Sequence, residues 1–250
     1  MEWYLVLAVI GAGFIAGFIN TLAGSGSLLT LPLLIFLGLP PTVANGTNRV
    51  AILLQTVVAV SSFKKQKVLD TKTGVRLGVF ALLGSVVGAM LAADLNEQVM
   101  EHTIGFLLII MTGLILFKPQ VWIKEHAGEV AAKSIPVQFI IYFFIGIYGG
   151  FIQAGVGFFL LAGLVLGSGL GLVKANAIKL LIMLIYTPVA LAVFMWNNQV
   201  DYKIGLILAL GNMLGALVAS RLAIKRGAIF IRYFLIIALT GSVLKLFGVF

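Results

Sequence analysis

The feature that most constrains this chain is a series of long apolar runs that recur from one end to the other. Several approach 20 residues, the length that a helix needs to cross about 30 Å of hydrocarbon. Backbone groups in lipid need internal hydrogen bonds, so such runs are helices or strands of a closed barrel. Barrel strands alternate apolar and polar residues, and stretches such as 106–117 do not. We therefore expect an all-α integral membrane protein.

Composition agrees with this class. The 250 residues are 61% hydrophobic and only 10% charged, whereas soluble domains carry about 25% charged residues. The formal charge is +9, but the basic residues gather in short loops beside apolar runs, where the positive-inside rule accounts for them. We therefore do not expect nucleic acid as a partner.

Ten apolar segments are predicted, five on each side of the polar stretch 118–134. They cover 3–22, 27–38, 43–63, 75–93, 101–117, 136–153, 157–168, 174–196, 203–221 and 230–248. This division predicts a first transmembrane repeat over 1–118, a cytoplasmic linker over 119–135 and a second repeat over 136–250. The second segment of each half is short for a spanning helix, so it either spans or forms a re-entrant loop.

The two halves also match in residues. The run GFIAGFIN at 13–20 resembles GIYGGFIQ at 146–153, and AGSG at 23–26 matches AGVG at 154–157. Further matches in the same order pair Ala44-Asn45 with Ala175-Asn176, Phe63 with Phe194, and Gly78, Gly84 and Gly88 with Gly205, Gly211 and Gly215. An ordered set of this kind predicts an internal repeat.

Loop charges predict how the repeats are oriented. The loop 64–76 carries five basic residues and should be cytoplasmic, while its counterpart 196–203 has one lysine and one aspartate. The next pair reverses: 94–102 is acidic and 221–232 is basic. Corresponding loops therefore lie on opposite sides, which is the inverted-topology repeat of many secondary transporters. A multi-pass protein of the inner membrane with both termini outside follows.

Polar residues break the apolar pattern where the second segment of each half begins. Residues 20–27 read NTLAGSGS, and residues 153–157 read QAGVG. Glycine permits tight turns, and a helix N-terminus presents unpaired N–H groups that bind anions. Packing glycines are the alternative, and they account well for Gly13, Gly17, Gly84 and Gly88. They account poorly for Asn20, Ser25 and Ser27.

Two cations lie just inside apolar runs, and an intramembrane charge is by default a functional hypothesis. Arg49 is as well explained by snorkelling to the interface, whereas Lys179 lies a turn deeper than Lys174. Gln55 and Tyr186 align, and packing is the favoured interpretation for both. The predicted substrate-binding residues are Asn20, Thr21, Gly24, Ser25, Gly26, Ser27, Asn45, Thr47, Asn48, Arg49, Gln153, Gly155, Gly157, Asn176 and Lys179.

What the apolar segments lack is also informative. All eight Asp and Glu residues fall in loops or near segment ends, so the predicted embedded charge is positive only. A cation carrier or a proton relay normally places an acid at membrane depth, so an anionic substrate is favoured. The segments also lack catalytic pairs and metal-ligand clusters, the chain has no cysteine, and no Walker loop occurs. We expect no enzyme activity, no metal and no cofactor.

These motifs resemble the sulfite exporter TauE/SafE family of membrane permeases. The resemblance rests on GFINTLAGSGS at 17–27, LPLL at 31–34, GLP at 38–40 and ANGTN at 44–48, with a weaker second copy, GGFIQAGVG, at 149–157. It implies export or uptake of sulfite, organosulfonates or related anions. The second half departs from the pattern, because Ile178 and Lys179 stand where a Thr-Asn pair would follow Asn176.

The sequence therefore predicts a secondary transporter that moves a small anion by alternating access, and the resemblance implies that this anion contains sulfur. An anion channel and a membrane scaffold or sensor without transport are the alternatives, and an intramembrane enzyme is disfavoured. The predicted partners are the anion and the lipid bilayer. A coupling ion, either H⁺ or Na⁺, and a homo-oligomer stay open.

Overall fold

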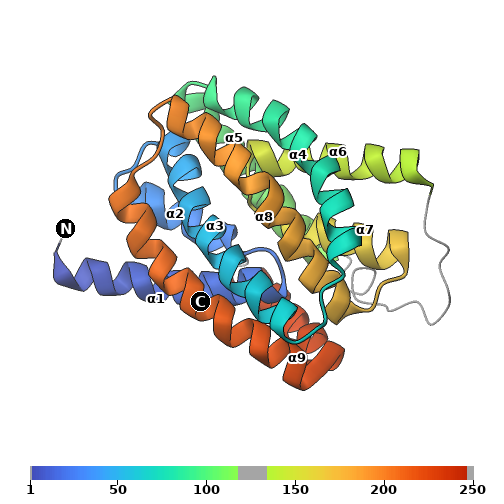
Figure 1. Cartoon of the computed structure of the whole chain (residues 1–250). Coiled ribbons are helices and arrows are strands. Elements are labelled where there is room, and N and C mark those ends of the chain that lie inside the picture. The colour runs from blue at the N-terminus through green and yellow to red at the C-terminus, as the bar shows by residue number, and fades with distance from the viewer. Residues whose placement is uncertain (1, 118–133, 247–250) are drawn as a thin grey trace.

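A computed structural model describes residues 2–117 and 134–246, and within these residues all regular secondary structure is helical (Figure 1). The predicted all-α class is thereby confirmed for the described chain. The helices are α1 (Trp3–Leu22), α2 (Ser27–Phe36), α3 (Pro41–Lys65), α4 (Thr71–Ala93), α5 (Glu97–Phe117), α6 (Ile135–Phe151), α7 (Val156–Ser168), α8 (Leu172–Trp196) and α9 (Tyr202–Leu246). The predicted linker 119–135 falls almost entirely outside the described residues.

Within the described chain, five helical stretches are long and apolar enough to cross a membrane. They are Trp3–Leu22, Pro41–Lys65, Thr71–Ala93, Leu172–Trp196 and Tyr202–Arg226. The helices α2, α6 and α7 are apolar but shorter. Large apolar side chains such as Phe36 and Trp196, each 88% exposed, cover the outer surface, as contact with lipid requires.

The last two predicted segments form one helix. The basic stretch 221–232, predicted as a loop, lies inside α9. Its residues Arg221, Lys225, Arg226 and Arg232 are good helix formers, and the stretch has no proline. Loop charge therefore did not locate a break in the helix.

Helices of the two halves are interleaved. The first helix of each half packs along the fourth segment of the other half, α1 on α9 and α6 on α4 (Figure 1). The contacts are backbone to backbone: a side chain on Gly17 would collide with the Asn212 backbone, and one on Gly150 with the Ser85 backbone. Small residues permit this close approach, which provides most of the attraction between helices in lipid.

The helices α3 and α8 form the centre of the molecule and are the most buried of the spanning helices. They contact each other, and each also packs on the fourth segment of the opposite half, α3 on α9 and α8 on α4. Two packed sets result, which we name the α1–α3–α9 unit and the α4–α6–α8 unit. The contact of α3 with α8 joins them.

Residues with a left-handed backbone recur at one spacing. Among the described residues they are Gly24, Gly38, Lys67, Gly155, Gly169 and Asn198. The last three follow the first three at a constant interval along the chain, the same interval that separates Asn45 from Asn176. Equivalent turns after the first, second and third helices of each half therefore have the same handedness.

Candidate functional site

The two helix breaks meet at the centre of the molecule. Between α1 and α2 the chain turns at Gly24, and between α6 and α7 it turns at Gly155. The N–H of Gly157 donates a hydrogen bond to the carbonyl oxygen of Gly24 over 3.2 Å. A side chain on either Gly24 or Gly157 would collide with the backbone of the other, so glycine is required at this crossing.

A helix that ends inside the membrane leaves carbonyl groups without partners, which is costly away from water. At the end of α6, Arg49 on α3 supplies these partners. Its Nη1 donates to Gly149 O over 3.0 Å, and its Nη2 donates to Gly150 O over 2.5 Å. The amide of Asn45 donates to Phe151 O over 2.8 Å. The Arg49 guanidinium therefore caps a helix of the other half.

The end of α1 is capped in the corresponding way by Lys179 on α8. Its ammonium donates to Asn20 O over 3.1 Å and to Thr21 O over 3.0 Å. Arg49 and Lys179 are both 0% exposed, so neither snorkels to an interface. Each cation bridges the two packed units, because Arg49 reaches from α3 to α6 and Lys179 reaches from α8 to α1.

These two cations are not neutralised by carboxylates. Among the described residues, the buried charged side chains are Arg49 and Lys179, and no Asp or Glu is buried. A helix C-terminus carries about half a negative charge, so two helix ends offset about one of the two positive charges. The remaining positive charge gives the centre a positive potential. Such a potential attracts a small anion.

A hydrogen-bonded amide network holds the first break in place. The amide of Asn20 donates to Gln55 Oε1 over 3.1 Å, and Asn212 on α9 donates to the same oxygen over 3.4 Å. Gln55 in turn donates to Thr21 Oγ1 over 3.4 Å. Gln55 thus ties the end of α1 to α3 and α9. Sequence reasoning missed Asn212, although an asparagine beside Gly211 in an apolar run was a visible signal.

The start of α2 is bonded to α3. Asn48 donates to Ser27 Oγ over 3.0 Å and accepts from Thr30 Oγ1 over 2.7 Å, and Thr30 was not among the predicted residues. Thr47 lies on a different contact, because its hydroxyl accepts from the backbone N–H of Asp201, which precedes α9. Thr47 therefore ties α3 to the start of α9.

Side-chain hydrogen bonds also hold the second break. Gln153 donates to Thr187 Oγ1 over 2.9 Å, and Tyr148 Oη donates to Ala154 O over 2.6 Å. Asn176 is fully buried, and neither its amide nitrogen nor its amide oxygen has a hydrogen-bond partner among the described residues. The Nε of Arg49 is buried without a partner in the same way. Donors left unpaired at such depth are available to a ligand.

All fifteen predicted site residues are buried, including Ser25, which is the most exposed of the polar ones at 7%. The surrounding helices therefore cover the helix breaks.

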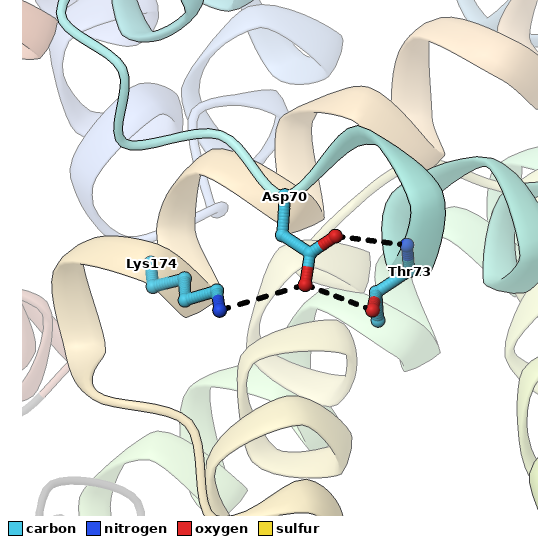
Figure 2. Close-up of polar contacts among 3 residues, drawn as sticks. All are labelled: Asp70, Thr73 and Lys174. Carbon is cyan, nitrogen blue, oxygen red and sulfur yellow. Dashed lines mark hydrogen bonds and ion pairs between the residues drawn. The ribbon is translucent and has the colours of Figure 1, made fainter.

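A separate polar contact joins the starts of α4 and α8. Asp70 caps α4 by accepting from the backbone N–H of Thr73 over 3.1 Å, and its other oxygen lies 3.5 Å from Lys174 Nζ (Figure 2). The N–H bond from Thr73 is the main reason that the pKa of Asp70 is lowered, and the charge of Lys174 lowers it further. This contact joins α4 to α8 at one end of the α4–α6–α8 unit.

Known proteins similar to this chain are named as membrane transporters. A probable membrane transporter protein of Sinorhizobium sp is 30% identical over 98% of this chain and 94% of its own length. Probable membrane transporter proteins of Haemophilus influenzae and Escherichia coli K12 are 25% and 28% identical over 93% and 89% of this chain, and over 91% and 82% of their own lengths. No solved structure matches.

The family comparison covers nearly the whole chain. Residues 9–246 match the family model of the sulfite exporter TauE/SafE. The match includes both helix breaks and both capping cations. This chain therefore belongs to the sulfite exporter TauE/SafE family, a family of membrane transporters rather than enzymes.

Proposed function

We propose that this protein is a secondary transporter that carries a small sulfur-containing anion, such as sulfite or an organosulfonate, across the inner membrane. The observation that carries the proposal is the pair of fully buried cations beside the two touching helix breaks, with no buried carboxylate among the described residues. An anion is the ligand that removes the excess positive charge. The family name gives sulfur oxyanions as the first class to test.

The donors for the anion are the groups that the protein leaves unpaired. The amide of Asn176 and the Nε of Arg49 fit this role, and the Ser25 hydroxyl lies at the first break. The start of α2 also has no side-chain cap. At the start of α7 the N–H groups of Gly157 and Phe158 already donate to backbone carbonyls, and at the start of α2 those of Leu28 and Leu29 do so as well. We therefore expect the Asn176 amide and the Arg49 Nε to lie closest to the anion.

The two halves form an inverted repeat in this proposal. The constant interval between left-handed residues supports the repeat, as do the reciprocal helix pairs and the reciprocal capping by Arg49 and Lys179. Loop charge supports the inversion, and in this proposal both termini lie outside. Contacts between loops agree, since Asp70 pairs with Lys174 on the side predicted to be cytoplasmic, and Gln199 bonds Ala93 O on the other.

Alternating access follows from how the units pack. The moving bodies are the α1–α3–α9 unit and the α4–α6–α8 unit rather than the two halves of the chain, because the closest helix contacts lie within these units. Arg49 and Lys179 each bond across the boundary between them. An anion that draws either cation away from its carbonyl partners changes the contacts that hold the units closed, and so couples binding to opening.

Flux measurement on purified protein in liposomes tests this function. Sulfite, an alkanesulfonate and sulfate would be loaded on one side under a proton gradient, a sodium gradient or no gradient. Saturable movement of a sulfur-containing anion is the expected result. Absence of flux for all three anions under every gradient overturns the proposal, and a large unsaturated conductance identifies a channel instead.

Asn176→Ala tests whether the Asn176 amide binds the anion. It removes two unpaired amide atoms and breaks no hydrogen bond to a described residue, so folding should be preserved while flux falls about tenfold, a loss of about 1.4 kcal/mol. Asn197→Ala, at an exposed position, is the control. If Asn176→Ala transports like the wild type, this residue is not part of the anion site.

A further inference from the structure

Two pockets on the outside of the helix bundle occupy equivalent places in the two halves. One, of about 430 Å³, lies between α3 and α9 and is lined by Val57, Val58, Ser61, Ser62, Lys65, Gln66, Leu217 and Arg221. The other, of about 390 Å³, lies between α4 and α8 and is lined by Met90, Asp94, Val189, Ala192, Val193, Trp196 and Asn197. We name them the α3–α9 pocket and the α4–α8 pocket.

The residues that line one pocket align with the residues that line the other. The interval that pairs Phe63 with Phe194 also pairs Lys65 with Trp196. The interval that pairs Gly88 with Gly215 also pairs Arg221 with Asp94. The same architectural position therefore carries two cations in one half, and a tryptophan and a carboxylate in the other.

The α3–α9 pocket is amphiphilic. Val57, Val58 and Leu217 form its apolar part, and Val57 is 44% exposed on the outer face that lipid would cover. Lys65 and Arg221 lie at the ends of the apolar stretches, and neither forms an ion pair with a described residue. Buried Ser62 and Ser220 bond to each other over 2.8 Å at this helix contact.

The pocket is distinct from the proposed anion site. Val58 lies nine residues after Arg49 on α3, which is about two and a half helical turns, so the two side chains point to opposite faces. The Arg49 face meets α6 and α8, whereas the pocket face meets α9. A transported anion would pass between the two packed units and would not cross this outer face.

We propose that the α3–α9 pocket binds the headgroup of an anionic phospholipid from the leaflet on the side predicted to be cytoplasmic. The phosphate would lie between Lys65 and Arg221, with Ser61 as a further donor, and an acyl chain would run along Val57 and Leu217. The negative phosphate would then face the two cations, and the acyl chain would face the apolar part of the pocket. The α4–α8 pocket, with Asp94 in place of Arg221, rejects the same headgroup.

Lipid titration tests this proposal independently of transport. Purified protein in a neutral detergent would receive phosphatidylglycerol, phosphatidylcholine or free glycerol 3-phosphate, with thermal unfolding and native mass spectrometry as readouts. Phosphatidylglycerol should raise Tm by roughly 3 °C and give a retained adduct, because it binds the folded state. Phosphatidylcholine and glycerol 3-phosphate should do neither.

Variants separate a built pocket from general surface charge. The double variant Lys65→Gln with Arg221→Gln should lose the shift and the adduct, while Lys72→Gln, at an exposed lysine outside the pocket, should keep both. The exchange Trp196→Lys with Asp94→Arg should create a second adduct in the α4–α8 pocket. Equal binding by the double variant, an equal loss in Lys72→Gln, or an equal shift with glycerol 3-phosphate overturns the proposal.

Discussion

The ammonium of Lys179 on α8 donates a hydrogen bond to the carbonyl oxygen of Thr21 at the end of α1, 3.0 Å away. This single contact connects the two halves of the chain, closes a helix end inside the membrane and leaves a positive charge at the centre. Arg49 does the same for α6. Two buried cationic side chains therefore serve both the fold and the proposed anion site.

Lys179→Met should reduce anion flux about tenfold or more, equal to about 1.4 kcal/mol, because it removes half of the buried positive charge. It also leaves the buried Thr21 carbonyl without its donor, whereas Asn20 O keeps the hydrogen bond from Gly24 N–H, at a cost of about 2 kcal/mol in the free energy of unfolding. Flux in liposomes and thermal unfolding measure the two effects. Lys174→Met, one turn away and 48% exposed, is the control and should change flux little. Wild-type flux in Lys179→Met would rule out a role for this charge.

Arg49→Lys keeps the positive charge but loses the pair of hydrogen bonds that the guanidinium forms. A guanidinium donates to Gly149 O and Gly150 O at once from two nitrogens, whereas a lysine presents one ammonium. We expect a loss of about 1–2 kcal/mol in the free energy of unfolding, with the sign of the site charge preserved. Arg76→Lys on α4 serves as the control. If both variants have the same stability, charge alone accounts for the role of Arg49.

Gly24→Ala should prevent the helices from packing into the native fold, because the new side chain would collide with the Gly157 backbone where the helix breaks cross. Gly38→Ala provides the matched comparison. Gly38 has the same left-handed backbone, at φ +89°, but open space around it, so its replacement should cost about 1 kcal/mol. The yield of folded protein after detergent extraction measures the difference. Similar yields for the two variants would show that the crossing tolerates a side chain.

Asp70→Ala should lower the free energy of unfolding by about 1 kcal/mol at pH 7, because α4 loses its cap. The folded state lowers the pKa of Asp70, so the ionised carboxylate adds stability above the unfolded pKa, about 4. That contribution is lost as pH falls through the lower folded pKa. The stability difference from wild type should therefore shrink below about pH 4, in thermal unfolding measured from pH 3 to pH 8.

Glu101→Gln, which removes a carboxylate from the exposed surface of α5, is the control variant. Asp70→Asn adds a second comparison. Its amide keeps the capping geometry but carries no charge for Lys174, so it should be less destabilised than Asp70→Ala at pH 7. A stability difference that stays constant down to pH 3 would contradict the assigned role of the Asp70 charge.

The positions of the apolar helices were largely predictable. The first predicted segment, 3–22, coincides with α1, and the polar breaks at 20–27 and 153–157 coincide with the ends of helices. Hydropathy and glycine patterns are local, so they report local structure directly. The continuous helix through 221–232 was not predicted, because loop charge reports the membrane surface rather than the path of the backbone.

The partners of the polar residues were not predictable in the same way. Gln55, which was interpreted as packing with one satisfied hydrogen bond, joins three helices at the first break. Thr47, which stays a predicted site residue, accepts a hydrogen bond from the backbone of Asp201 before α9. A sequence states which side chains can donate or accept. It does not state which distant backbone group each one meets.

The sequence by itself determined that this chain is helical and membrane-embedded, because a run of apolar residues needs lipid and its backbone needs helical hydrogen bonds. It also placed the two cations and the two helix breaks along the chain. Only the tertiary structure decided that each cation caps the broken helix of the opposite half and that the breaks touch at Gly24 and Gly157. Those contacts join residues about 100 or more positions apart, and only the packing of whole helices against one another brings them together.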